Sequence, residues 1–332
     1  IAASYDQLLI VGDADGITAT PQAVESADTG GNASLLYLST TEVYCPGPGG
    51  TSNTTFGKNA GDALTTNGNY NVFIGEEAGS AMASGTNNIA IGYGAFDAAD
   101  AGEDDCIAIG LNALGNLNHA SSVRNIAIGS GAGDGMGTLA GSTDNVFVGT
   151  NAGGGTWVTA VSTQNVAMGT SALGGALNAS NNNVVVGNNA GASITTGDEN
   201  VIIGSAAGDG AVDVDSLVIV GFYAGTAALE SGADGTVLIG AGAGAALTSG
   251  IGNTAIGYQS LDANQTSDYN TAVGTSALGA VNGDGDGRNT ALGWNAGLSI
   301  TSGISNVLIG AEAGDGFDAE SDNIAIGFQA AS

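Results

Sequence analysis

The chain has 332 residues, of which 59 are Gly and only 3 are Pro, and 43% are hydrophobic. Its 32 acidic residues stand against 3 basic ones, which gives a formal net charge of −29. This charge repels nucleic-acid phosphates and anionic membrane surfaces, so we expect neither as a partner. The regular apolar positions exclude disorder, and collagen is excluded because the sequence has no Gly-X-Y period.

Residues 1–50 differ from the rest of the chain. Residues 8–12 and 35–43 are apolar and predict two strands, and residues 46–50 are rich in Pro and Gly, which is typical of a linker. We interpret residues 1–50 as a small N-terminal β domain that trimerises the remainder or attaches it to a larger particle.

From residue 51 to residue 332, one unit recurs at intervals of 17 to 20 residues. It reads Asn, then Val, Ile or Thr, then a small or apolar residue, then an apolar residue, Gly, two variable residues and Ala, as in residues 125–132. Internal repeats of this length indicate a solenoid of stacked rungs. The repeat Gly stands at Gly57, Gly75, Gly92, Gly110, Gly129, Gly149, Gly169, Gly187, Gly204, Gly221, Gly240, Gly257, Gly274, Gly293, Gly310 and Gly327.

The three residues before each repeat Gly predict a short strand, because they are rich in β-branched side chains and too few for a helix. We expect Gly to form a corner with positive φ. The repeat Asn is expected to form an Asx-turn before the strand, and stacked Asn side chains could also form a ladder. The remaining 9 to 12 residues of each unit are polar and predict outer turns.

The middle strand residue predicts how the rungs assemble. It points away from its two neighbours, yet it is also small or apolar, as at Ala127, Val185 and Ile202. A strand that is apolar on both faces is buried on both faces. We therefore expect one face to fill the coil and the middle row to pack against other copies, in a parallel homotrimer. A single-chain coil with a wide interior is the alternative. Sixteen rungs predict a rod of about 75 Å.

Residues 88–92, 125–129 and 253–258 resemble the head repeats of trimeric autotransporter adhesins and similar repeats of bacteriophage tail-fibre proteins. The resemblance covers most of the chain and implies a trimeric left-handed β-roll. The unit is longer than that of adhesin heads, and the sequence shows no recognisable membrane anchor. Both departures favour a relationship to bacteriophage tail-fibre proteins over one to adhesins.

Groups that could carry chemistry are few. His119 is the only histidine, and it lies in a variable turn with no nucleophile beside it. Residues 13–16 and 284–287 begin like calcium loops but lack the Glu that such loops carry at position twelve. Residues 240–244 are the repeat itself rather than a nucleotide-binding loop. Paired carboxylates occur in turns at Glu76 and Glu77, Asp104 and Asp105, Asp213 and Asp215, and Asp284 and Asp286.

We therefore expect no enzyme and no catalytic, cofactor-binding or metal-ligating residue, with at most loose binding of a divalent cation such as calcium. A fibre-borne glycan hydrolase is the least favoured hypothesis, because these carboxylates do not converge across a groove. Trp157, Tyr223 and Trp294 could stack on sugars or pack between rungs, and packing is favoured for Tyr223 and Trp294 beside the repeat Gly. Cys45 and Cys106 are too few for a disulfide framework and are expected to be free buried thiols.

The sequence as a whole predicts an all-β solenoid of about sixteen rungs that serves as a structural virion protein. We expect a bacteriophage tail or capsid fibre, located on the virion or outside the cell, whose rigid trimeric rod projects toward the host surface. Its expected partners are its own copies, other virion proteins through residues 1–50, and a host surface glycan or protein. A bacterial surface adhesin or a self-assembling extracellular filament subunit is the alternative.

Overall fold

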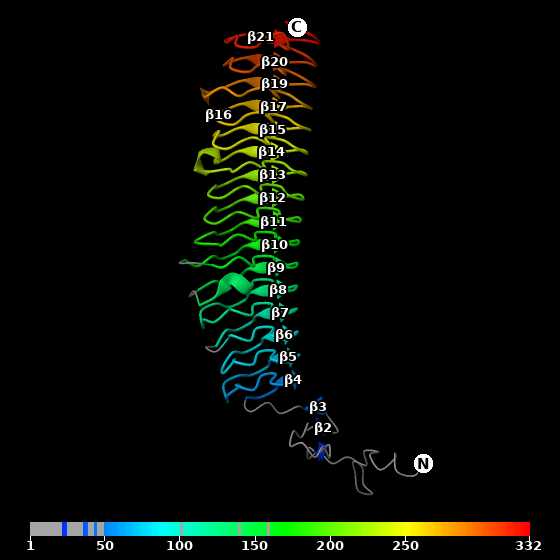
Figure 1. Cartoon of the computed structure of the whole chain (residues 1–332), viewed down its shortest axis with the longest axis vertical. Coiled ribbons are helices and arrows are strands. Elements are labelled where there is room, and N and C mark those ends of the chain that lie inside the picture. Colours follow the sequence, from blue (N-terminus) through cyan, green and yellow to red (C-terminus); the bar gives the residue numbers. More distant parts are fainter. Residues whose placement is uncertain are drawn as a thin grey trace, which may run out of the picture.

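The computed structural model describes residues 50–99, 102–138, 141–157 and 160–332, together with three short strands nearer the N-terminus. Sixteen strands of three residues each form one parallel sheet, and they stack in sequence order along the rod (Figure 1). These strands are β4 (Thr54–Phe56), β5 (Val72–Ile74), β6 (Ile89–Ile91), β7 (Ile107–Ile109), β8 (Ile126–Ile128), β9 (Val146–Val148), β10 (Val166–Met168), β11 (Val184–Val186), β12 (Val201–Ile203), β13 (Val218–Val220), β14 (Val237–Ile239), β15 (Thr254–Ile256), β17 (Thr271–Val273), β19 (Thr290–Leu292), β20 (Val307–Ile309) and β21 (Ile324–Ile326).

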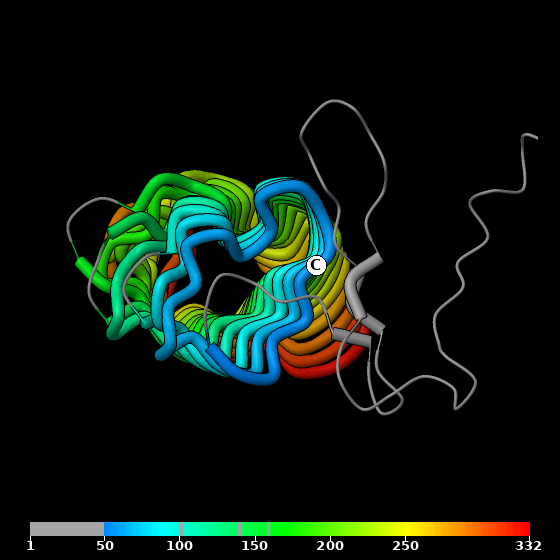
Figure 2. The backbone as a smooth tube through the Cα atoms, turned by 90° about the horizontal axis from the view of Figure 1, so that it is seen from below, coloured from blue at the N-terminus to red at the C-terminus, as the bar shows by residue number. Residues whose placement is uncertain are grey.

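The register of the sheet is the same from end to end. Each strand pairs in parallel with the strands of the preceding and following repeats, as Ala127 pairs with Phe147 and Phe147 with Ala167. Sixteen strands bound fifteen complete turns of the chain, and these turns lie over one another when viewed along the rod (Figure 2). The predicted all-β solenoid is confirmed.

The middle residue of each strand points into the coil of its own chain. Ala127, Val185 and Ile202 are fully buried, whereas the residues on either side of them are partly exposed. The middle row was predicted to contact other copies, and this prediction is wrong, because the row is buried inside its own coil. The turns of one narrow coil suffice to bury the row, because its side chains are small or are matched by a gap elsewhere in the rung.

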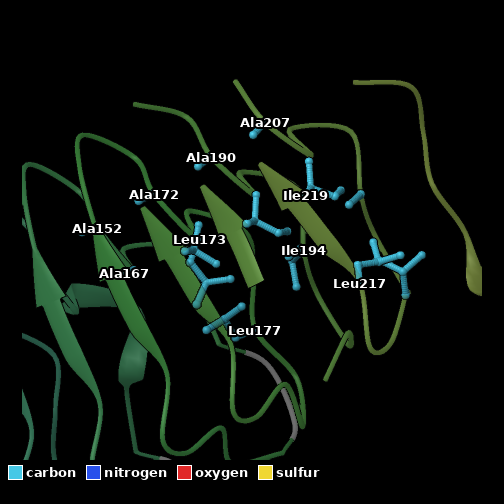
Figure 3. Packing of buried hydrophobic residues seen from close by; sticks show 14 of the residues in the cluster. Ala152, Ala167, Ala172, Leu173, Leu177, Ala190, Ile194, Ala207, Leu217 and Ile219 are labelled. Carbon is cyan, nitrogen blue, oxygen red and sulfur yellow. The ribbon is translucent and has the colours of Figure 1, made fainter. Parts of the chain in front are cut away.

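That match follows a simple rule, which involves the residue six positions after the middle one. In twelve of the sixteen rungs, a small middle residue is followed by a large side chain, or a large one by Gly. Ala127 and Ala291 are exceptions followed by Gly133 and Gly297, and there the space is filled from neighbouring rungs, by Leu114 and Phe147 and by Leu278 and Leu308. A Cβ on Gly153 would lie 2.7 Å from the ring of Phe147, so the two positions share one volume. Figure 3 shows Leu173, Leu177 and Ile194 in this interior. Small-then-large pairs are Ala90 and Phe96, Ala108 and Leu114, Ala167 and Leu173, Ala255 and Leu261, and Ala272 and Leu278. Large-then-Gly pairs are Phe73 and Gly79, Phe147 and Gly153, Val185 and Gly191, Ile202 and Gly208, Ile219 and Gly225, Leu238 and Gly244, and Leu308 and Gly314.

The repeat Gly forms the expected corner. Its φ lies between 127° and 147° in all sixteen copies, a region that other residues avoid. A Cβ on Gly129 would also lie 2.5 Å from the carbonyl oxygen of Gly149 in the next rung. Backbone conformation and rung spacing therefore both require Gly here.

The repeat Asn forms a buried ladder. Asn145 donates its backbone N–H to Oδ1 of Asn125 at 3.1 Å, and its Nδ2 donates to the carbonyl oxygen of Ser162 at 3.0 Å. The ladder prediction is confirmed, but the Asx-turn prediction is wrong, because the amide oxygen accepts from the next rung instead of its own turn. Cys106, Leu217 and Thr236 interrupt the ladder, yet Asn200 still accepts from the backbone N–H of Leu217 at 2.9 Å.

The turns opposite the sheet hold the remaining regular structure. Two short 3₁₀ helices, η1 (Asp134–Met136) and η2 (Ser231–Ala233), lie there, and β16 (Ser267–Asp268) pairs in parallel with β18 (Gly285–Asp286). Within the described residues, no helix has the length and apolar character needed to cross a membrane.

Near the N-terminus, β1 (Gln22–Val24), β2 (Leu36–Leu38) and β3 (Val43–Tyr44) form an antiparallel sheet. The single strand predicted over residues 35–43 is wrong, because β2 and β3 run in opposite directions. The strand predicted over residues 8–12 and the linker at 46–49 lie outside the described residues. The N-terminal domain remains a prediction.

Candidate functional site

The outward face of the sixteen-stranded sheet is a continuous uncharged surface along the rod. It consists of the first and third residues of each strand, and we call it the outward strand face. These positions hold only Val, Ile, Thr, Leu, Met and Phe, with no charged side chain. Ile128, Met168 and Ile203 are among those that remain clearly exposed. From the geometry of strands, the face measures about 75 Å by about 10 Å.

A face without charge is notable on a chain whose formal net charge is −29. Within the described residues, the carboxylates lie outside the sixteen-stranded sheet, where many of them join successive rungs. Asp104 accepts hydrogen bonds from the backbone N–H and the hydroxyl of Thr86 at 2.7 and 2.8 Å. Asp215 accepts from the backbone N–H of Asp198 at 2.7 Å.

The other sequence-predicted carboxylate pairs have similar roles. Asp213 accepts from the hydroxyl of Thr196 at 2.7 Å, and Asp284 from that of Thr266 at 2.8 Å. Glu76 lies 3.0 Å from the Lys58 ammonium group. These carboxylates therefore hold neighbouring rungs together by side-chain hydrogen bonds or ion pairing.

Each of the three basic side chains pairs with an acid. Besides Lys58, Arg124 pairs with Asp144 at 2.6 Å, and Arg288 pairs with Asp286. The hydrogen bond from Arg124 lowers the pKa of the Asp144 carboxyl. The remaining negative charge of the turns is thus not neutralised within the chain.

Burial acts in the opposite direction on three other carboxyl groups. The pKa values of Asp97, Asp134 and Asp262 are raised, chiefly because partial burial disfavours the charged form. They lie in different turns, and in the described part of the chain no three His, Cys, Asp or Glu side chains are grouped to hold a metal ion.

The burial of the three aromatic side chains named from the sequence differs from the prediction. Trp157 is buried and packs edge to face against Phe147, with ring centroids 6.1 Å apart. Tyr223 and Trp294, which were expected to pack between rungs, are instead about half exposed. Trp294 directly follows the repeat Gly and Tyr223 lies two positions after it, and the corner turns both side chains outward.

Three further candidates named from the sequence lie within the described residues. His119 is half-buried, and its Nδ1 accepts from the backbone N–H of Ser121 at 3.2 Å. Cys106 is a buried free thiol, and desolvation raises its pKa to about 12. Gly240 takes the corner φ of the repeat. Cys45 and residues 13–16 lie outside the described residues.

The fold and surface together define a single-chain parallel β-solenoid with one uncharged wall and acidic turns. Comparisons with protein-family models, with curated proteins and with solved structures found no match.

Proposed function

We propose that this protein is a structural rod of an extracellular particle, with a bacteriophage tail or capsid fibre as the particle that best fits its repeats. The rod would project toward a host surface and contact a glycan or protein there. Residues 1–50 would attach it to other virion proteins. No catalytic role is proposed.

The continuity of the sheet supports a load-bearing rod. Each strand lies between the strands of the neighbouring repeats without a break in register from β4 to β21. The buried Asn ladder and the carboxylates of the turns add side-chain hydrogen bonds between the same rungs. Bending the rod would break several of these contacts at once, so stiffness follows from the repeat.

The outward strand face is the observation that carries the proposal of self-association. Its flat outline of about 750 Å² is of the same order as the roughly 800 Å² of accessible surface that each partner contributes to a stable protein interface. Exposed apolar patches of this size on soluble proteins mark interaction sites. A parallel homotrimer would bring three such faces together around one axis, and charged side chains would remain outside it.

Analytical ultracentrifugation of the purified chain tests this proposal. We expect a discrete trimer, and a double variant Ile128→Lys, Ile203→Lys should sediment as a monomer, because both changes place charge in the face. The matched control is Ala120→Lys, Ser193→Lys, which adds the same charges on exposed turns. A monomeric wild-type chain would contradict self-association, and circular dichroism verifies that each variant remains folded.

A further inference from the structure

Aromatic side chains alternate with small ones along one column of the upper rod. The column consists of the residue directly after each repeat Gly, and the alternation covers the last seven rungs without exception. We call its four aromatic members the aromatic ladder. In chain order the column reads Phe222, Ala241, Tyr258, Thr275, Trp294, Ala311 and Phe328.

Hydrogen bonds between rungs fix the spacing of this column. The carbonyl oxygen of every member except Phe328, in the last rung, accepts from a backbone N–H in the next rung, as Tyr258 accepts from Ser276 at 2.9 Å and Trp294 from Glu312 at 2.8 Å. Its members therefore continue the rung spacing of the adjacent strands. Aromatic residues on every second rung stand about 9.6 Å apart.

The fold does not require aromatic residues at this position. In the lower nine rungs the same column holds Lys58, Glu76, Ser130 and other side chains, with Tyr93 as the one aromatic exception. The four rings of the ladder are between 52% and 72% exposed. Among the described residues, no ring contact joins two members of the ladder, and Phe222 packs edge to face against Tyr223, outside the ladder, with ring centroids 4.3 Å apart. The rings thus stabilise neither the interior nor one another, while exposing apolar surface to water.

We propose that the aromatic ladder binds an extended chain of β-1,4-linked N-acetylated amino sugars, as in chitin. Successive sugars of such a chain are turned by half a rotation, so that every second ring presents the same face. The length of this disaccharide repeat is close to the two-rung spacing. Aromatic rings offer an apolar face to the C–H groups of a sugar, and the small residues between them leave the alternate sugar unobstructed.

Polar side chains flank the ladder in the next column. Gln259, Asn295, Glu312 and Gln329 directly follow Tyr258, Trp294, Ala311 and Phe328, and Gln329 already donates from Nε2 to Glu312 at 2.6 Å. Amide and carboxylate groups can exchange hydrogen bonds with the acetamido groups of an amino sugar.

Charge narrows the choice of polysaccharide. The chain carries a net charge of −29 and would repel polymers with uronate or sulfate groups. Chitin is neutral apart from occasional free amines, which are cationic and complement the acidic rod. The inference deepens the proposed contact with a surface glycan and rests on that function for its biological meaning, but the binding itself does not depend on the oligomeric state.

Depletion of the purified chain by insoluble chitin at pH 7 tests the inference, with microcrystalline cellulose as the comparison. We expect saturable binding to chitin that weakens by about tenfold or more in Trp294→Ala, as for a central aromatic contact residue. Tyr93→Ala is the matched control, because Tyr93 is an isolated, equally exposed aromatic residue of the same column. This variant should bind chitin like the wild-type chain.

A swap variant tests the spacing itself. Thr275→Trp combined with Trp294→Thr keeps composition and charge but moves one ring by a rung, so it should bind as weakly as Trp294→Thr alone. Wild-type affinity in the swap would overturn the spacing argument. The whole inference would be overturned if the wild-type chain were not retained on chitin, or were retained equally on cellulose.

Sedimentation of the same variants separates this inference from self-association. The ladder variants should sediment like the wild-type chain, whereas the lysine variants of the outward strand face should still bind chitin. If Trp294→Ala changed the oligomeric state and left chitin binding intact, the column would belong to the interface and the inference would be wrong.

Discussion

The strand wall and the turns opposite it obey different rules within every rung. The wall has three residues per strand in all sixteen repeats, whereas the turns absorb the variation in repeat length from 17 to 20 residues. Longer repeats place the additional residues in structures such as η1 and η2, with no effect on strand register. Contacts between rungs constrain the wall at each atom, while the turns need only to close the coil.

The largest difference in stability between the strand wall and the turns is expected when a Gly is substituted in each of them. Gly149→Ala should prevent folding or destabilise the rod by more than about 3 kcal/mol, because strain at its φ of 137° adds to a backbone clash. The new Cβ would lie 2.4 Å from the carbonyl oxygen of Gly169. Urea unfolding followed by circular dichroism measures the change.

Gly235→Ala is the matched control in a turn. Gly235 also has positive φ, but nothing lies within 4 Å of a Cβ built there. We expect a loss of about 1–2 kcal/mol, which is the cost of the left-handed conformation alone. Equal losses in the two variants would show that rung contact does not constrain the wall.

A smaller loss is expected when the interior of a rung is emptied. Leu173→Ala removes a fully buried side chain beside Ala167 and should destabilise the rod by about 2–5 kcal/mol, whereas Leu111→Ala removes a half-exposed one and should have little effect. Calorimetric unfolding measures both.

The double variant Ala167→Ile, Leu173→Gly tests the volume rule directly, because it copies the native arrangement of Ile202 and Gly208. It should recover part of the stability that Leu173→Gly alone loses. If the two changes were simply additive, the volume rule would fail as an account of the interior.

The smallest effect on stability is expected from protonation of carboxyl groups in the turns. Because the folded-state pKa values of Asp97, Asp134 and Asp262 are raised, the folded chain binds protons more tightly at these groups than the unfolded chain does. Stability should therefore rise modestly as the pH falls from neutral toward 3.8, the ordinary pKa of an Asp carboxyl, and relief of charge repulsion adds to it. Thermal unfolding at several pH values measures the slope.

Two variants assign the slope to particular carboxyl groups. Asp97→Asn removes a group with a raised pKa and should flatten the pH dependence. Asp144→Asn removes a group whose pKa Arg124 lowers, and which favours the folded state at higher pH, so the dependence should steepen. A rise of stability with pH in the wild-type chain would contradict this account.

Much of the fold was predictable because the repeat makes each rule visible sixteen times. The strand, the Gly corner and the Asn ladder all follow from one unit, and the structure confirms them. The faces of the strand were assigned wrongly, since alternation shows that Ala127 and Ile128 point apart but not which of them points inward. The exposure of Tyr223 and Trp294 was missed for a related reason, because it depends on how the corner turns the chain.

The sequence by itself determined the period, the strands, the corners and the negative charge, because each depends on residue type at a fixed local spacing. Only the tertiary structure decided which side chains fill the coil, because that choice depends on volumes shared between positions six residues apart and in neighbouring rungs. The same stacking turned residues 34 to 36 apart in the chain into the aromatic ladder, which exists only as a row in space.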